Sequence, residues 1–320
     1  MSLMENETAK PASRVRQVSV SADEAGQRID NFLSRYLKGV PRSHIYRILR
    51  RGEVRVNRGR IRPRYKVQAG DTVRIPPVRL EPARERVPDP GKLPAIVGRI
   101  LYENSRLLVL NKPAGIAVHG GSGLSYGVIE ALRALHPEAP YLELVHRLDR
   151  ETSGCLMIAR RRSALRDLHM QLREGRVTKH YLALVNGALT GPRRVDAPLR
   201  KNQVQGGERM VRVQADGKPA ATVFRPVSRH GEATLVEAVL ETGRTHQIRV
   251  HAKHIGHPLA GDEKYGDAEF NRHMKKHGLR RMFLHAHMLE FTDPASGEPV
   301  NISAPLDDDL KGVLDSLDAG

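Results

Sequence analysis

The stretch VHRLDRETSG, residues Val145 to Gly154, is followed at once by the apolar run CLMIA. The apolar residues predict a buried central strand over Ser153–Ala159, because a strand covered on both faces shows no polar alternation. Asp149 precedes this strand and lies between Arg147 and Arg150, so we expect it on a loop at the edge of a sheet. Such a carboxylate is either a salt-bridged loop residue or a catalytic group, and ion-pair networks are the commoner of the two.

Strands and helices follow each other irregularly on both sides of this loop. Upstream, RILYENSRLLVLNKPAG predicts two strands around a turn at Glu103–Ser105, and SYGVIEALRALHP predicts a helix. Downstream, SALRDLHMQLREG predicts a helix that ends at Gly175, while KHYLALVNG, ATVFRPV and ATLVEAVLET predict strands. The chain lacks a strict strand–helix–strand rhythm, so the pattern favours an α+β fold with a mixed sheet.

Three further blocks accompany this stretch: NKPAG (Asn111–Gly115), KHYLALV (Lys179–Val185), and TGRTHQIRVH (Thr242–His251) followed by GHPLAGDEKYG. Together with HRLDRETSG, and in this order, they resemble the motifs of the RluA-type pseudouridine synthases. The resemblance implies a pseudouridine synthase catalytic domain with a mixed, largely antiparallel sheet. It also implies that the chain isomerises specific uridines to pseudouridine in large-subunit (23S) ribosomal RNA, without a cofactor.

The same resemblance assigns roles to matching positions. Asp149 is the expected catalytic carboxylate, Tyr181 packs against the target base, and Arg249 pairs with Asp149, while Arg147 helps to take the place of the flipped nucleotide. The reaction breaks a glycosidic C–N bond, turns the uracil and rejoins it through carbon. It needs a carboxylate beside the ribose, to attack the anomeric carbon or to remove a neighbouring proton. An arginine keeps this carboxylate ionised, a tyrosine offers a face for stacking, and the base must leave its stack to reach them.

A smaller unit precedes these motifs. Apolar residues at helical spacing predict a helix from Ile29 to Leu37, and a second helix with Ser43 as its N-cap and Gly52 as its stop. EVRVN and TVRIP predict short strands. The stretch RIDNFLSRYLKGVPRSHIYRILRRGEVRVN, followed by AGDTVRIP, resembles an S4-type RNA-binding domain. This resemblance implies RNA contacts by basic residues of the second helix and its flank, namely Arg42, Arg47, Arg50, Arg51 and Arg55.

The domain organisation follows from these patterns. We expect a disordered tail over residues 1–16, an S4-like RNA-binding domain over 17–79, a proline-rich linker over 80–95, and the catalytic domain over 96–320.

The formal net charge of the chain is +17, of which +12 lies between Arg28 and Arg86. A basic excess inside a folded pattern favours RNA as the partner over a merely solvated surface. No apolar run approaches the roughly 20 residues that span a bilayer, and the N-terminus lacks the apolar core of a signal peptide. With a single cysteine, Cys155, no intrachain disulfide can form. We therefore expect a cytoplasmic, monomeric protein with no membrane partner.

Other features admit alternative readings. Four histidines suggest a metal site, but arginine and lysine residues crowd the same segment, so we expect no metal; the histidines are His246, His251, His254 and His257. HGGSG (His119–Gly123) is more typical of a flexible loop than of a phosphate cradle, and Cys155 is more typical of a core residue than of a nucleophile. Two rival functions remain: an RNA-binding module that has lost activity, and a nucleosidase that releases the base.

Overall fold

The computed structural model of the protein describes residues 15–37, 40, 42–78, 96–120, 126–203 and 209–319. The chain divides into two compact units, Met1–Val87 and Pro88–Gly320, described here separately as the N-terminal unit and the C-terminal unit. The expected linker over residues 80–95 lies outside the described residues, as does the expected tail up to residue 14. The expectation that Arg16 belongs to the tail is wrong, because Arg16 is the first residue of strand β1 and pairs with Ile75.

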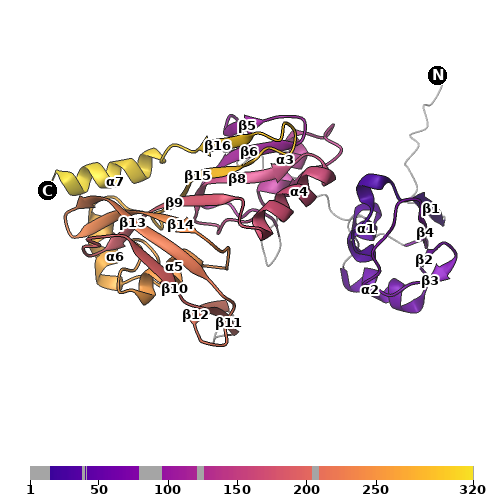
Figure 1. Cartoon of the computed structure of the whole chain (residues 1–320), viewed down its shortest axis with the longest axis horizontal. Helices are drawn as coiled ribbons and strands as arrows, with labels where there is room; N and C mark the ends of the chain where they lie inside the picture. Colours follow the sequence, from indigo (N-terminus) through magenta and orange to yellow (C-terminus); the bar gives the residue numbers. More distant parts are fainter. Residues whose placement is uncertain are drawn as a thin grey trace, which may run out of the picture. The chain divides into compact units, whose positions relative to one another are not determined.

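The N-terminal unit packs two helices against a four-stranded sheet of order β1-β4-β2-β3 (Figure 1). The largest apolar side chains predicted to face inward are fully buried, among them Phe32 and Leu33 of the first helix and Ile45 and Leu49 of the second. Ser43 is not the N-cap, because the second helix already begins one residue earlier. The elements are β1 (Arg16–Ser19), the 3-10 helix η1 (Ala22–Glu24), α1 (Ile29–Tyr36), α2 (Arg42–Arg51), β2 (Arg55–Val56), β3 (Gly59–Arg60) and β4 (Thr72–Ile75).

The C-terminal unit is built on a ten-stranded sheet whose main path is β10-β13-β14-β9-β15-β8-β6-β5, with β16 beside β15 and β7 beside β8. Among the described strands, every pair is antiparallel except β8 with β15, which confirms the expected mixed, largely antiparallel sheet. The strands of this sheet are β5 (Ile100–Glu103), β6 (Leu107–Lys112), β7 (Glu143–Leu144), β8 (Ser153–Ala159), β9 (Thr178–Asn186), β10 (Arg193–Asp196), β13 (Ala221–His230), β14 (Ala233–Leu240), β15 (Leu284–Thr292) and β16 (Pro299–Ser303).

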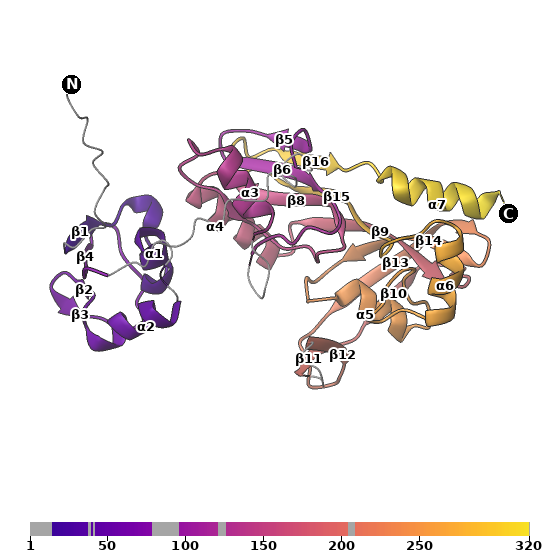
Figure 2. The same cartoon turned by 180° about the vertical axis from the view of Figure 1, so that it is seen from behind.

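Two strands and five helices complete the unit (Figures 1 and 2). Strands β11 (Leu199–Gln203) and β12 (Arg209–Val213) form a separate two-stranded sheet. The helices are α3 (Val128–Leu135), α4 (Arg162–Arg173), α5 (Gln247–His254), α6 (Ala268–Lys276) and α7 (Asp308–Asp318). Within the described ranges, no helix is both long and apolar enough to cross a membrane.

Helices cover both faces of the large sheet, and β8 shows why its sequence is apolar throughout. Alternate residues of a strand point to opposite faces. Leu156 and Ile158 pack in the core that contains α3 and α5, whereas Cys155 and Met157 pack in the core that contains α4. All seven residues of β8 are buried, as the apolar run predicted. Cys155 is fully buried here, and burial raises the pKa of its thiol to about 12, as fits a core residue.

Gly154 is the second residue of β8 and has a positive φ of 102°. It pairs with Lys112 of β6 on one side and with Ala286 of β15 on the other. A Cβ atom at this position would overlap the carbonyl oxygen of Ala286. Only glycine therefore allows β15 to pair this closely with the start of β8. This position directly follows the loop that carries Asp149.

We predict that Gly154→Ala lowers the free energy of unfolding by about 3 kcal/mol or more, because it combines a positive φ with a backbone overlap. The matched control is Gly312→Ala in α7, where no atom lies within 4 Å of the added Cβ. This change should stabilise by about 0.5–1 kcal/mol, since alanine has the higher helix propensity. Denaturant unfolding of both variants provides the measurement. Equal stabilities would contradict the close approach of β8 and β15.

Candidate active site

Asp149 lies on the loop between β7 and β8, as its position before the apolar run predicted. Several hydrogen bonds hold this loop. The backbone N–H of Thr152 donates to the carbonyl of Asp149 over 3.1 Å, and the N–H of Gly115 donates to the carbonyl of Arg150 over 2.9 Å. The Nε2 atom of His146 accepts a hydrogen bond of 3.1 Å from the N–H of Met157. Burial lowers the pKa of His146 to about 3, so its ring stays neutral and keeps this acceptor.

Arg249, on α5, bridges two carboxylates. Its Nη1 lies 3.2 Å from Oδ2 of Asp149, while its Nε and Nη2 donate to both oxygens of Asp262 over 2.6 and 2.7 Å. Burial alone lowers the pKa of Arg249, but the hydrogen bonds and charge of Asp262 outweigh it and the pKa is raised. Burial likewise favours a higher pKa for Asp262, and Arg249 reverses this to a lowered one. The pair is therefore ionised, and Arg249 holds Asp149 with its remaining N–H groups.

Tyr181, on β9, borders the same site. A crevice of about 70 Å³ is lined by its side chain together with Asp149, Arg249 and His246. Burial raises the pKa of the Tyr181 hydroxyl, and the charge of Asp149 raises it by a smaller amount. The hydroxyl therefore stays protonated at neutral pH and can donate a hydrogen bond. Because Tyr181 belongs to the face of the sheet covered by α3 and α5, its ring reaches the loop and the helix that carry the other two groups.

His246 directly precedes α5 and adopts a left-handed backbone conformation with φ of 55°, which is uncommon for a residue other than glycine. Its Nε2 lies 3.7 Å from Oδ2 of Asp149, and its Nδ1 lies 2.9 Å from the hydroxyl of Tyr265. Burial lowers the pKa of His246, against the opposing effect of Asp149. The guanidinium of Arg249 lies over the ring of Tyr265, 4.9 Å from its centroid. His246, Tyr265 and Asp262 thus form a supporting layer around Arg249.

Asp149 also faces a larger cavity of about 820 Å³. Basic residues from several elements line this cavity: Arg147, Arg150, Lys264, Lys275, Arg280 and Arg281. Arg147 and Arg150 are exposed, on either side of Asp149 in the sequence. Glu151, Asp262 and Glu263 also line the cavity, but cations outnumber the carboxylates, so the cavity attracts a polyanion.

Behind the loop, Lys112 is a fully buried cation at the end of β6. Its Nζ donates to three backbone carbonyls, those of Pro113, Ile116 and Arg150, over 2.7, 2.9 and 3.1 Å. An ammonium group has three donors, and here each has one acceptor. Burial lowers the pKa of this group from its usual 10.5 to about 7. Lys112 therefore ties the NKPAG segment to the residue that follows Asp149.

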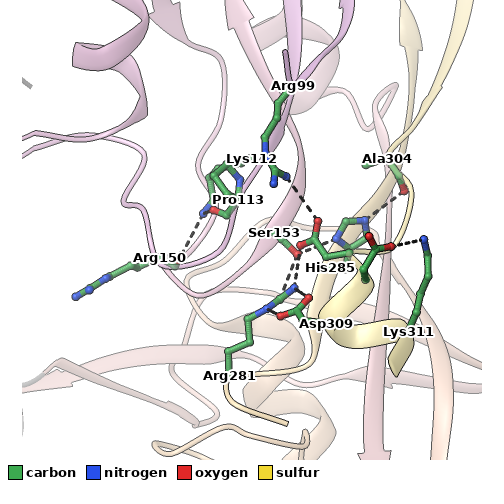
Figure 3. A network of polar contacts seen from close by, with 12 residues as sticks. Arg99, Lys112, Pro113, Arg150, Ser153, Arg281, His285, Ala304, Asp309 and Lys311 are labelled. Carbon is green, nitrogen blue, oxygen red and sulfur yellow. Dashed lines mark hydrogen bonds and ion pairs between the residues drawn. The ribbon is translucent and has the colours of Figure 1, made fainter. Parts of the chain in front are cut away.

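A second network holds the start of β8 (Figure 3). The Oγ of Ser153 lies 2.8 Å from Nδ1 of His285 and accepts a bond of 3.3 Å from Nη1 of Arg281. Arg281 donates further to both oxygens of Asp309 and to Asp307, at the N-terminal end of α7. The C-terminal helix is thereby connected to the loop that presents Asp149.

Three of the four histidines of the 246–257 segment, His246, His251 and His257, have individual partners. His251 is fully buried between Thr222 Oγ1 and the carbonyl of Ala197, each at 2.9 Å, and His257 Nδ1 lies 2.7 Å from the carbonyl of Asn186. In the part of the chain that the structure describes, no group of three or more His, Cys, Asp or Glu residues is placed to hold a metal ion. The last three residues of HGGSG lie outside the described residues.

Comparison with known proteins identifies the family. A model described as RNA pseudouridylate synthase matches residues 106–254, and one described as S4 domain matches residues 27–73. The chain is 58% identical over 308 residues to the ribosomal large subunit pseudouridine synthase C of Escherichia coli O157:H7, covering 95% of this chain and 97% of the relative. The chain belongs to the RNA pseudouridylate synthase family. It is therefore an isomerase that converts uridine to pseudouridine in RNA.

Other relatives of this pseudouridylate synthase agree. The ribosomal large subunit pseudouridine synthase C of Pasteurella multocida is 57% identical over 307 residues, with 95% of this chain and 94% of the relative covered. Among solved structures, human RNA pseudouridylate synthase domain containing 4 is 27% identical with a TM-score of 0.58, and covers 70% of this chain and 95% of its own. The resemblance to the RluA-type synthases and the S4 domain is thus confirmed.

The fold of this pseudouridylate synthase brings together Asp149, Tyr181 and Arg249, which are widely separated in the sequence. Asp262, the stronger partner of Arg249, was not singled out from the sequence, although it lies in the quoted block GHPLAGDEKYG. The arginines expected to contact RNA in the N-terminal unit lie on or beside α2: Arg47, Arg50, Arg51 and Arg55 are exposed, and the side chain of Arg42 is outside the described residues.

We predict that Lys112→Met lowers the free energy of unfolding by about 2–4 kcal/mol, because three carbonyls lose their donor and at least one stays buried and unpaired. The folded chain binds fewer protons than the unfolded chain between about pH 7 and 10.5, since the folded pKa of Lys112 is the lower one. The wild type should therefore gain stability relative to Lys112→Met as the pH rises from about 7 to about 9.

Thermal and denaturant unfolding at several pH values provide the measurement. The matched control is Lys311→Met, since this half-exposed lysine pairs with Asp308 over 2.9 Å at the surface. Its loss should cost about 0.5 kcal/mol or less. If both lysine variants lose the same small amount, the three bonds of Lys112 do not hold the loop.

Proposed function

We propose that this enzyme isomerises specific uridines in large-subunit ribosomal RNA, with Asp149 as the catalytic carboxylate. The observation that carries the proposal is the bridge from buried, ionised Asp262 through Arg249 to Asp149, at the mouth of a crevice that also holds Tyr181. The substrate class comes from the relatives, whose names specify the ribosomal large subunit.

The roles in the reaction follow from the chemistry of each group. Asp149 acts on the ribose of a flipped uridine, by attacking C1′ or by removing the proton at C2′, and the C1′–N1 bond breaks. The freed uracil turns and C5 bonds to C1′, which displaces Asp149 in the first route and is accompanied by return of the proton to C2′ in the second. C5 then loses its proton and N1 gains one, so the product is an isomer of the substrate. Arg249 pairs with Asp149 and orients it. Tyr181 packs against the uracil and limits its movement, and Arg147 helps to fill the place that the flipped nucleotide leaves.

The N-terminal unit supplies affinity under this proposal. Arg42, Arg47, Arg50, Arg51 and Arg55 neutralise phosphates, which binds RNA without reading its sequence. Support comes from the exposure of Arg47, Arg50 and Arg55, for which the described residues include no carboxylate at ion-pair distance. We further propose that the enzyme acts as a monomer in the cytoplasm, where ribosomal RNA is transcribed and modified in bacteria such as its relatives.

We predict that Asp149→Asn reduces pseudouridine formation to background while RNA affinity changes less than about threefold, because the substitution removes the charge and keeps the shape. Asp315→Asn, at an exposed position of α7, is the control and should retain full activity. The measurement is a map of pseudouridines in large-subunit ribosomal RNA with and without the protein, followed by single-turnover assays of both variants. Wild-type turnover by Asp149→Asn, or free uracil among the products of the wild type, would overturn the assignment.

The reaction is redox-neutral and adds no group, so we propose that it needs neither a metal nor an organic cofactor. Activity should survive dialysis and EDTA unchanged. Loss of activity in EDTA that zinc restores would instead assign the histidines around α5 as ligands.

A further inference from the structure

Strands β11 and β12 form a hairpin-like sheet that projects from the C-terminal unit below β10 and α5 in Figure 1. Its register places Arg200 directly opposite Arg212, so the two arginines share one face. Like charges in this arrangement destabilise a sheet. Asp216 pairs with Arg200 and offsets part of the repulsion. Arg212 is exposed and has no ion pair among the described residues. A cost of this kind suggests selection for binding a polyanion.

A groove of about 490 Å³ lies between β11 and the loop at residues 243–245. Lys201, Lys218 and Arg244 line it, together with the Arg200–Asp216 pair. Lys201 and Lys218 are exposed, and neither has an ion pair within the described part of the chain. Three cations without a matching carboxylate give the groove a net positive charge.

Arg244 connects this groove to the catalytic crevice. Its side chain lines both the groove and the 70 Å³ crevice that contains Asp149 and Tyr181. Its Nε donates to the carbonyl of Pro219 over 3.0 Å, which fixes the direction of the guanidinium. Arg244 therefore places a cation where the groove and the crevice meet.

The β11–β12 sheet is also packed against the residues that support Arg249. The backbone N–H of Val211 in β12 donates to the hydroxyl of Tyr265 over 2.9 Å. The same hydroxyl lies 2.9 Å from Nδ1 of His246, and the Tyr265 ring packs under the guanidinium of Arg249. Leu199, Val211 and Tyr265 belong to one small apolar core with Val250 of α5. The groove and Asp149 are thus parts of one packed assembly.

We propose that the groove between β11 and residues 243–245 binds the phosphodiester backbone of the RNA strand adjacent to the target uridine, through Lys201, Lys218 and Arg244. The inference rests on the proposed function and adds the path of the substrate to it. A flipped nucleotide remains joined to the strand by two phosphates, and the groove receives the strand on one side. Lysine binds phosphate as a point charge, so the contact supplies affinity and alignment independently of base sequence.

The test is the double charge reversal Lys201→Glu/Lys218→Glu in the full-length protein. The matched control is Arg173→Glu/Arg229→Glu, which makes the same change in net charge at two exposed positions, one at the end of α4 and one near the far end of β13. Binding to a transcript of Escherichia coli large-subunit ribosomal RNA is measured as a function of salt. Single-turnover rates of pseudouridine formation are measured at saturating RNA.

We expect the groove variant to lose at least about tenfold in affinity and the slope of log K against log salt to become shallower by about 1.4, the value for two phosphate contacts of a single strand. The control should stay within about threefold of the wild type in affinity and keep its slope. Groove and control variants with the same affinity and slope would overturn the proposal. Failure of the proposed function is distinguished by the wild type itself, which would then form no pseudouridine in this RNA.

Thermal unfolding establishes whether the charge reversals fold. Should the groove variant unfold, Lys201→Gln/Lys218→Gln removes the same two contacts without adding negative charge. It should show the same loss of slope, and an unchanged slope in this variant would equally overturn the proposal.

Discussion

The bridge formed by Arg249 between Asp262 and Asp149 is the interaction on which the site depends. A buried guanidinium requires a buried counter-charge, and Asp262 provides it with two short bonds. Asp262 is itself held by the backbone N–H groups of Lys264 and Tyr265. Arg249 gives two bonds to Asp262 and one to Asp149, so a single contact from Nη1 orients Asp149.

Two glycines near this bridge pack directly against the backbone of β15 and of the residues that precede it. A Cβ at Gly154 would overlap the carbonyl of Ala286, and a Cβ at Gly261 would overlap that of Arg281. Gly154 follows the loop of Asp149, and Gly261 directly precedes Asp262. The same short segment, residues 281–286, thus sets the position of both carboxylates. Lys112 adds bonds from β6 to the loop, and Arg281 adds one from α7 through Ser153.

Positive charge is distributed in two places with different tasks. The N-terminal unit carries most of the net charge of the chain on a small fold without any of the catalytic groups. In the C-terminal unit, cations line the cavity that contains Asp149 and the groove that meets the crevice at Arg244. Charge far from the reacting atoms raises affinity, while charge near them also sets alignment. Under the proposed function, attraction of RNA and placement of one uridine are thereby assigned to different parts of the chain.

The sequence alone predicted those helices and strands whose apolar residues form a recognisable local pattern. The apolar run of β8, the apolar and β-branched residues of β9, β13 and β14 and the helical spacing of α1, α3 and α4 each identified their element, because burial and strand propensity act on neighbouring residues. Motif order identified the family, and the family resemblance paired Arg249 with Asp149. Helix α5 was missed because four basic or histidine side chains obscure its period, and β11 and β12 carry equally weak patterns. Helix α7 was missed although Leu310, Val313, Leu314 and Leu317 follow a helical period.

The tertiary structure alone decided that Asp262 is the main partner of Arg249, that Lys112 and Arg281 hold the catalytic loop, and that a basic groove meets the crevice at Arg244. These contacts join residues brought together by the strand order β9-β15-β8, and no periodicity along the chain specifies which strands become neighbours.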